Sequence, residues 1–61
     1  MDNIEIKLLQ TLLDIEGLEV DLYMEEEDNA PRETLENIRE QIEKQRAILR
    51  EQCELYITTS L

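Results

Sequence analysis

Residues 4–24 form an apolar stretch with hydrophobic side chains on two sides of the helix that they predict. Successive residues of an α-helix lie about 100° apart, so positions three or four residues apart share a face. One apolar stripe contains Ile4, Leu8, Leu12, Ile15, Leu18 and Leu22. A second stripe contains Ile6, Leu9, Leu13, Val20 and Met24. Packing against one neighbour requires only one stripe, so this segment predicts neighbours on two sides.

The chain has 61 residues, one cysteine and no histidine. Ordering this many residues costs on the order of 90 kcal/mol, which a small core barely offsets. A single cysteine cannot form an internal disulfide, and without histidine the usual zinc ligand sets are missing. Chains of this size usually need such a cross-link or a partner. We therefore expect self-association or binding to another protein, with an antiparallel homodimer that forms a four-helix bundle as the leading arrangement.

A second helical pattern follows a turn at residues 27–30. Asn29 is expected to cap this helix, and Pro31 suits its first turn. Apart from a skip across Gln45, its main stripe alternates spacings of three and four residues and contains Leu35, Ile38, Ile42, Leu49, Cys53 and Tyr56. Residues 1–61 are therefore predicted to form one all-α domain. It is an antiparallel, coiled-coil-like two-helix hairpin with helices over about 2–26 and 31–57 and a frayed tail at 58–61.

Two local features leave alternatives open in the first helix. Residues 18–24 alternate between apolar and polar side chains, which is a β-strand pattern. We prefer a helix, because the leucine pairs at 8–9 and 12–13 fit only the helical period and an isolated pair of strands is marginal. Gly17 costs a helix up to ~1 kcal/mol relative to alanine. It is either a tolerated exposed glycine or a kink or close approach by another helix.

Arginines on the second helix predict how the two helices align. Arg32, Arg39 and Arg46 repeat every seven residues beside the main stripe. Folding the chain about Asp28 would place Arg39 near Glu16 or Glu19, and Arg50 near Glu5. Flanking charges of this kind set register, although each exposed pair contributes only ~0.2–1 kcal/mol. The residues expected to set the hairpin register are Glu5, Glu16, Glu19, Arg39, Arg46 and Arg50.

The net charge of −10 is concentrated in the first half of the chain. Residues 1–28 hold ten acids and one base (−9), whereas residues 29–61 hold six acids and five bases (−1). Such a charge disfavours direct binding to nucleic acid and favours basic partners. The acidic block at residues 21–28 is a candidate docking patch or, alternatively, a solvated turn that aids solubility. Its proposed docking residues are Asp21, Glu25, Glu26, Glu27 and Asp28.

No residue pattern predicts catalysis. The chain lacks a histidine for general base chemistry, and Gly17 alone cannot form a glycine-rich phosphate loop. Cys53 lies on the predicted core stripe, so we expect a buried structural thiol. We expect no enzymatic activity, no cofactor and no metal. No apolar run approaches the ~20 residues of a membrane span and no signal peptide is recognisable, which predicts a cytoplasmic protein that does not bind membranes.

Three functions are consistent with these features. The first is a small adaptor, co-chaperone or regulator that binds another protein through the second apolar stripe, Ile6, Leu9, Leu13, Val20 and Met24. The second is an acidic, DNA-mimic-type inhibitor, of the kind that phages and mobile elements encode, which blocks a nucleic-acid-binding protein. The third and least favoured is an RNA-binding hairpin dimer using the arginines, because glutamates surround them. The two-helix plan resembles that of the ROP family of RNA-binding hairpin dimers, and this resemblance is architectural only.

Overall fold

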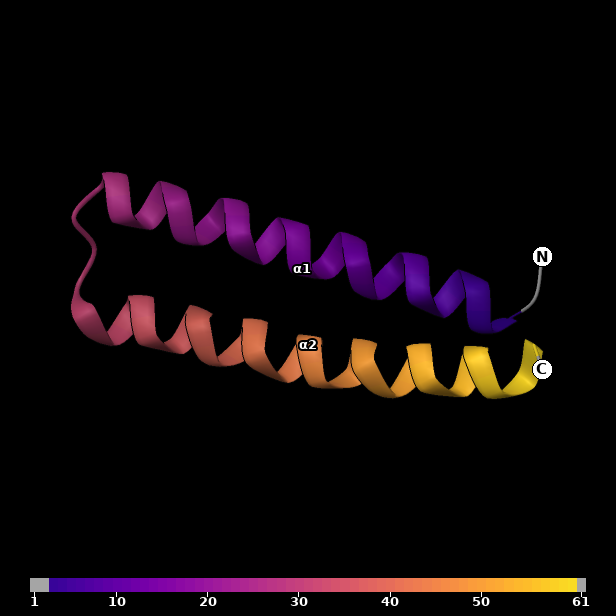
Figure 1. Ribbon diagram of the computed structural model, residues 1–61. Helices are drawn as coiled ribbons and strands as arrows, with labels where there is room; N and C mark the ends of the chain where they lie inside the picture. Colours follow the sequence, from indigo (N-terminus) through magenta and orange to yellow (C-terminus); the bar gives the residue numbers. More distant parts are fainter. Residues whose placement is uncertain (1–2, 61) are drawn as a thin grey trace.

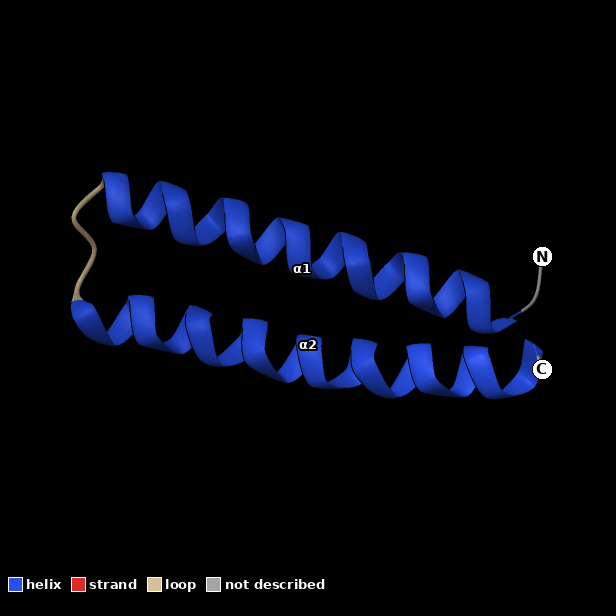
Figure 2. Ribbon diagram, viewed as in Figure 1, coloured by secondary structure: helices blue, strands red, loops and turns tan. Residues whose placement is uncertain are grey.

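The chain forms an antiparallel hairpin of two α-helices (Figure 1), as the helical periodicity predicted. The computed structural model describes residues 3–60, with α1 at Asn3–Glu27 and α2 at Arg32–Ser60. Residues 18–24 belong to α1, and no strand occurs among the described residues (Figure 2), so the strand alternative is wrong. The Cα positions span 46 × 18 × 11 Å, and the two helices form a single layer (Figure 1).

The turn between the helices is formed by the end of α1. Asn29 has a φ angle of 56°, in the left-handed region. Its backbone N–H donates to the Glu26 carbonyl at 3.2 Å, and the Ala30 N–H donates to the Glu25 carbonyl at 2.9 Å. These two hydrogen bonds form a Schellman motif, which satisfies carbonyls at the helix C-terminus. Asn29 therefore terminates α1 and does not cap α2 as expected, because asparagine tolerates the left-handed conformation well.

The bounds of α2 also differ from the predicted ones. The Pro31 carbonyl accepts hydrogen bonds from the N–H groups of Thr34 at 3.0 Å and Leu35 at 3.2 Å, so Pro31 precedes the helix that begins at Arg32. At the other end, residues 58–60 of the expected frayed tail are helical. The hydroxyls of Thr58 and Thr59 each donate at 2.8 Å to the carbonyl four residues earlier. The predictions for Asp2 and Leu61 lie outside the described residues.

The helices pack through one continuous seam in which spacings of three and four residues alternate without a break. On α1 its members are Ile4, Leu8, Thr11, Ile15, Leu18 and Leu22. On α2 its members are Leu35, Ile38, Ile42, Gln45, Leu49, Gln52 and Tyr56. Ile15 and Ile42 are the two buried hydrophobic residues among residues 3–60. The hairpin alone therefore has a narrow core.

Three polar residues occupy seam positions that the sequence analysis did not assign to the core. Thr11 is buried, whereas the predicted core residue Leu12 is 49% exposed. On α2, Gln45 and Gln52 complete the alternation, and Cys53 is exposed, so the expectation of a buried thiol is wrong. The regular spacing of a two-helix coiled coil determines which positions face inward, even where the side chain at that position is polar.

Thr11 and Gln52 form a polar contact within the seam. The Thr11 hydroxyl lies 2.9 Å from the Lys7 carbonyl oxygen and 2.8 Å from Gln52 Oε1. A hydroxyl has one hydrogen to donate and can also accept, and the Gln52 amide can present either its oxygen or its NH₂ group. No buried side-chain polar atom is left without a hydrogen-bond partner among the described residues. The polar layer is thus satisfied within the chain.

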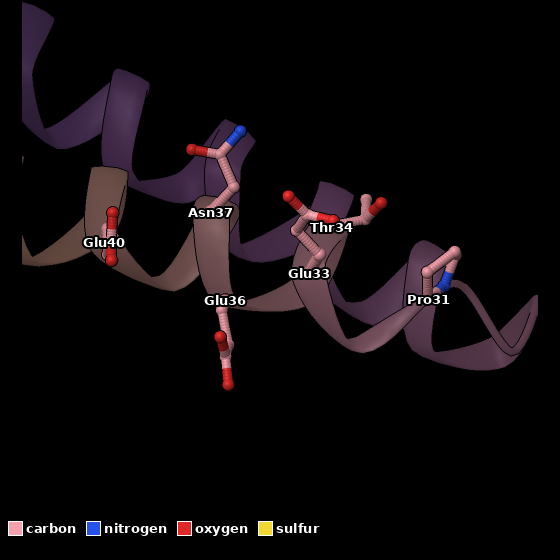
Figure 3. A pocket seen from close by; sticks show the side chains of 6 residues that line it. All are labelled: Pro31, Glu33, Thr34, Glu36, Asn37 and Glu40. Carbon is pink, nitrogen blue, oxygen red and sulfur yellow. The ribbon is translucent and has the colours of Figure 1, made fainter.

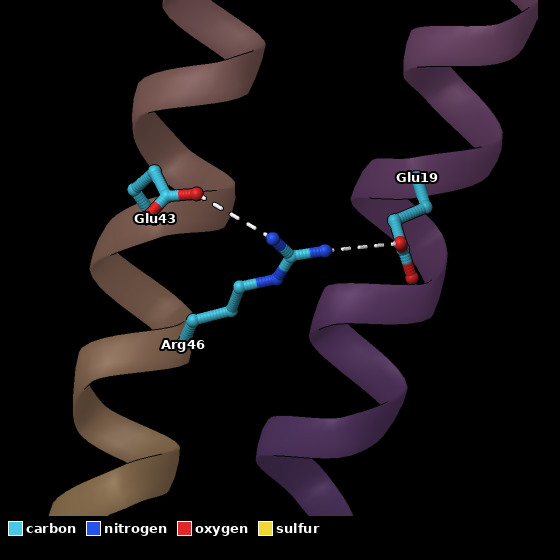
Figure 4. Close-up of polar contacts among 3 residues, drawn as sticks. All are labelled: Glu19, Glu43 and Arg46. Atoms are coloured by element: carbon cyan, nitrogen blue, oxygen red, sulfur yellow. Dashed lines mark hydrogen bonds and ion pairs between the residues drawn. The ribbon is translucent and has the colours of Figure 1, made fainter.

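The charged pairs define a register that differs from the predicted one. Arg39 pairs with Glu26 at 3.4 Å, two helical turns along α1 from Glu19. Arg46 lies between Glu19 of α1 and Glu43 of α2, at 3.5 Å from each (Figure 4). The chain reverses its direction near Pro31 and not at Asp28, because the residues of the Schellman turn separate the end of α1 from the start of α2.

The acid expected to face Arg50 takes a different partner. Glu5 accepts a hydrogen bond from the Tyr56 hydroxyl at 3.3 Å. The predicted pairs of Arg39 with Glu16 or Glu19, and of Arg50 with Glu5, are therefore replaced.

Candidate protein-binding face

The five residues of the second apolar stripe remain exposed in the hairpin. Their exposed fractions are 39% for Ile6, 49% for Leu9, 67% for Leu13, 51% for Val20 and 56% for Met24. We call these five residues the outer face of α1. At ~100° per residue they lie roughly 180° around the helix from the seam, on the opposite side of α1. The hairpin therefore leaves the outer face directed away from α2, and its use as an interface stays a prediction.

Two further large apolar residues border the outer face. Tyr23 is 64% exposed and Leu12 is 49% exposed. Glu16 lies in line with the outer face, one turn from Leu13 and from Val20, and its side chain is exposed. The apolar surface of α1 is thus continuous along most of the helix and carries one acid near its middle.

Gly17 lies beside the outer face, and nothing within the hairpin requires a glycine there. Its φ angle is not positive. A Cβ atom built on Gly17 would meet no other atom within 4 Å. An alanine would therefore fit, and would favour the helix by up to ~1 kcal/mol. Within the hairpin the tolerated-glycine interpretation fits, because α2 does not approach Gly17 and the residue is exposed. A close approach by a helix of another molecule stays a prediction.

The two margins of the outer face differ in charge. One margin is uncharged and contains Gln10 and Gly17, in line with Met24 of the outer face. The other margin contains the acids Glu5, Glu19 and Glu26, and each of them is engaged within the hairpin. Their partners are the Tyr56 hydroxyl, Arg46 and Arg39, respectively. The carboxylates next to the outer face are therefore partly neutralised by α2.

The five residues of the predicted acidic docking patch lie in different environments. Glu25 is half-buried and Glu26 pairs with Arg39, whereas Asp21, Glu27 and Asp28 are exposed. Within residues 3–60, Glu26 is the only member of the patch that forms an ion pair. The free negative charge at the turn therefore comes from four of the five residues.

Arginines of α2 that were candidates for binding RNA form ion pairs with glutamates. Arg32 pairs with Glu36 at 2.8 Å, in addition to the pairs that Arg39 and Arg46 form. All of these pairs are about half or more exposed to solvent. A polyanion would have to displace these carboxylates, which opposes the use of the arginines for binding RNA.

A surface depression at the start of α2 offers no catalytic or metal-binding arrangement among the described residues. It has a volume of about 570 Å³ and lies at the start of α2, lined by Pro31, Glu33, Thr34, Glu36, Asn37 and Glu40. Figure 3 shows that Glu36 projects away from the side on which Glu33 and Asn37 lie. Its carboxylates therefore do not converge on one point. Among the described residues, no group of three or more cysteine, aspartate or glutamate side chains is placed to hold a metal ion.

Comparison with protein-family models, curated proteins and solved structures finds no match to this chain. Neither helix, within the part that the structure describes, is long and apolar enough to cross a membrane. The functional interpretation therefore depends on the exposed surfaces of the hairpin.

Proposed function

We propose that this protein is a non-enzymatic protein–protein interaction module that binds its partner through the outer face of α1. The observation that carries this proposal is the exposure of five large apolar side chains, 39–67% each, along one side of a helix. Solvent-exposed positions of a coiled-coil hairpin are normally polar. A contiguous apolar surface of this kind marks an interaction site.

The outer face can supply a useful binding free energy. Full burial of such a side chain contributes ~1.5–3 kcal/mol, so burying the half that is still exposed adds roughly 1 kcal/mol for each residue. Five residues give about 5 kcal/mol from this protein, and an apolar partner helix contributes a similar amount. Association costs about 4–15 kcal/mol, so at the lowest cost about 6 kcal/mol remain, which corresponds to a dissociation constant of tens of micromolar. Helical adaptors and regulators bind by this mode.

One observation favours a second candidate function, the acidic inhibitor. The carboxylates of Asp21, Glu27 and Asp28 are exposed and form no ion pair within residues 3–60. They lie at the turn, where they could contact a basic surface such as the nucleic-acid channel of another protein. Because charge–charge attraction between exposed groups is screened by salt, this binding would weaken strongly at ~0.5 M salt, whereas apolar binding would persist.

A pair of matched variants tests the proposed function. Leu13→Glu places a charge on the outer face, and Ile57→Glu places one at a site on α2 with similar exposure (67% and 58%). Each tagged variant is used to capture proteins from the organism that encodes the chain, with circular dichroism to verify helix content. We expect Leu13→Glu to lose the proteins that wild type and Ile57→Glu both retain at ~0.5 M salt. Equal capture by all three would exclude the outer face as the binding surface.

A further inference from the structure

We propose that the partner of the outer face is a basic amphipathic helix of another protein. Its apolar side chains pack on the outer face, and its lysine or arginine side chains pair with acids of α1. This inference rests on the proposed function, because it names the chemistry of the partner at the same surface. Three observations carry it: the spacing along the outer face, the charges around it and the open space at Gly17.

The outer side of α1 has the spacing of a second helical seam. One row of residues there follows intervals of three and four, as the α1–α2 seam does: Ile6, Leu9, Leu13, Glu16, Val20 and Tyr23. A row with this alternation interlocks with the same alternation on another helix. At ~1.5 Å per residue the row is about 25 Å long, which matches a partner helix of about 17 residues. The occupant that fits this row is therefore a helix.

The charge of α1 favours a basic partner helix. α1 contains eight acids and one base, Lys7, whereas α2 contains six acids and five bases. Lys7 lies nearer to the seam than to the outer face, so no basic side chain of α1 borders the outer face. A second copy of this chain would bring the same acids to this surface. A basic helix would instead neutralise them, which is the complementarity that selects between partners.

Three exposed acids around the outer face form no ion pair within residues 3–60, and we call them the free acids. Glu16 lies within the row, and Glu27 lies in line with Val20 at the end toward the turn. Asp21 lies one turn from Gly17, beyond the uncharged margin. Free carboxylates thus occur on both sides of the outer face, where basic side chains on both flanks of a partner helix can reach them. Each such pair adds little to the affinity, but together they favour a basic helix over an acidic one.

A hole at the middle of the outer face can accept a long basic side chain. In a pair of packed helices, a side chain of one helix inserts between four residues of the other, at positions i, i+3, i+4 and i+7. One such hole is bounded by Leu13, Glu16, Gly17 and Val20. Gly17 leaves one side of it open, since a Cβ atom built there would meet no other atom within 4 Å. The stem of a lysine or arginine can pack on Leu13 and Val20 while its charged end reaches Glu16.

Three designed helical peptides of about 17 residues test the chemistry of the partner. The first has leucines on one face with lysines beside them, and the second has glutamates in place of the lysines. The third has the residues of the first in an order that spreads the leucines around the helix. By calorimetric titration at ~0.05 M salt, we expect the first peptide to bind at least tenfold more tightly than either of the others, and at ~0.5 M salt to bind more weakly but measurably. Equal binding of the lysine and glutamate peptides would overturn the inference, as would complete loss of binding at ~0.5 M salt, which would show that charge alone holds the peptide.

A pair of triple variants tests which acids bind the lysine peptide. One variant replaces the free acids with amides: Glu16→Gln, Asp21→Asn and Glu27→Gln. The control removes the same charge from exposed acids of α2 that form no ion pair within residues 3–60: Glu40→Gln, Glu51→Gln and Glu54→Gln. We expect the first variant to weaken binding at ~0.05 M salt at least threefold more than the control, and the two to bind alike at ~0.5 M salt. Equal weakening at ~0.05 M salt would mean that the peptide responds only to net charge, and would refute the site.

Filling the hole tests where the partner helix lies. Gly17→Leu should weaken binding of the lysine peptide at least fivefold, with circular dichroism to verify that the helix content is retained. Ala47→Leu, also a small-to-large change at an exposed helical site, is the control on α2 and should leave binding unchanged. Equal binding by the two variants would contradict the placement of the partner helix over Gly17.

Two further results separate this inference from the proposed function. Sedimentation equilibrium of the protein alone should give the monomer mass at the concentrations used for the titrations. A doubled mass that Leu13→Glu abolishes would instead show that a second copy covers the outer face, and would overturn the inference. If the three peptides bind alike but Leu13→Glu still loses captured proteins, the proposed function stands and this inference fails.

Discussion

The buried contact between Thr11 and Gln52 gives the sharpest quantitative prediction for the hairpin itself. Thr11 is 6% exposed and its hydroxyl lies 2.8 Å from Gln52 Oε1. Replacing Thr11 with valine keeps the shape but leaves the half-buried Gln52 amide without this partner, at a cost of ~1–3 kcal/mol, of which the new methyl group offsets about 0.8 kcal/mol. Gln52→Leu is less costly, because the Thr11 hydroxyl keeps its bond to the Lys7 carbonyl.

The double variant should be more stable than the two single changes predict. Replacing both partners with apolar groups removes the unsatisfied amide, so we expect a coupling free energy of about 1 kcal/mol. For a chain of this size, 1 kcal/mol shifts the melting temperature by ~4–8 °C. Urea denaturation followed by circular dichroism at 222 nm, in the Leu13→Glu background, measures the four variants. Single effects that add to within ~0.3 kcal/mol would refute the idea that the two side chains act as a pair.

Three further predictions concern single sites. Gly17→Ala in the Leu13→Glu background should stabilise the hairpin by up to ~1 kcal/mol, since its Cβ meets no atom within 4 Å; a lower melting temperature would show crowding at this site. Asn29→Val should destabilise the hairpin by ~1–2 kcal/mol and Asn29→Gly should not, because the φ angle of 56° suits glycine; equal stability of the two would contradict the assigned turn. The exposed Cys53 thiol should react with an aromatic disulfide reagent in the folded protein nearly as fast as in 8 M urea, on the order of a few-fold slower at most; hundredfold protection would indicate that α2 is covered there.

Helical periodicity was sufficient to predict the fold, but not the membership of the seam. Grouping residues by hydrophobicity places Leu12 and Cys53 in the core. The alternation of three and four residues runs instead through Thr11 and Gln52, which the folded chain tolerates because the two side chains satisfy each other. A template that counted positions before residue types would have found both. A hydrophobicity pattern rarely identifies polar seam residues, because their hydrogen-bond partners lie on another helix.

The register could not be predicted from charge because α1 offers too many acids. Glu19 and Glu26 lie on the same edge two turns apart, so an arginine can pair with either one at similar cost. The backbone conformation of Asn29 decides between them, since it fixes where α2 begins. The exposure of the outer face was easier to predict. Its residues and the seam lie on opposite sides of α1, so α2 covers only one of the two stripes.

The contacts between the helices enclose very different lengths of chain. The Glu26–Arg39 contact closes a separation of 13 residues, Thr11–Gln52 closes 41 and Glu5–Tyr56 closes 51. Because the entropic cost of closure rises with length, the hairpin should zip from the turn and fray from its far end. Amide hydrogens in the first turns of α1 should then exchange with solvent fastest. Ile6 and Leu9 lie at this fraying end, so a partner that binds the outer face would also stabilise the part of α1 that α2 stabilises least.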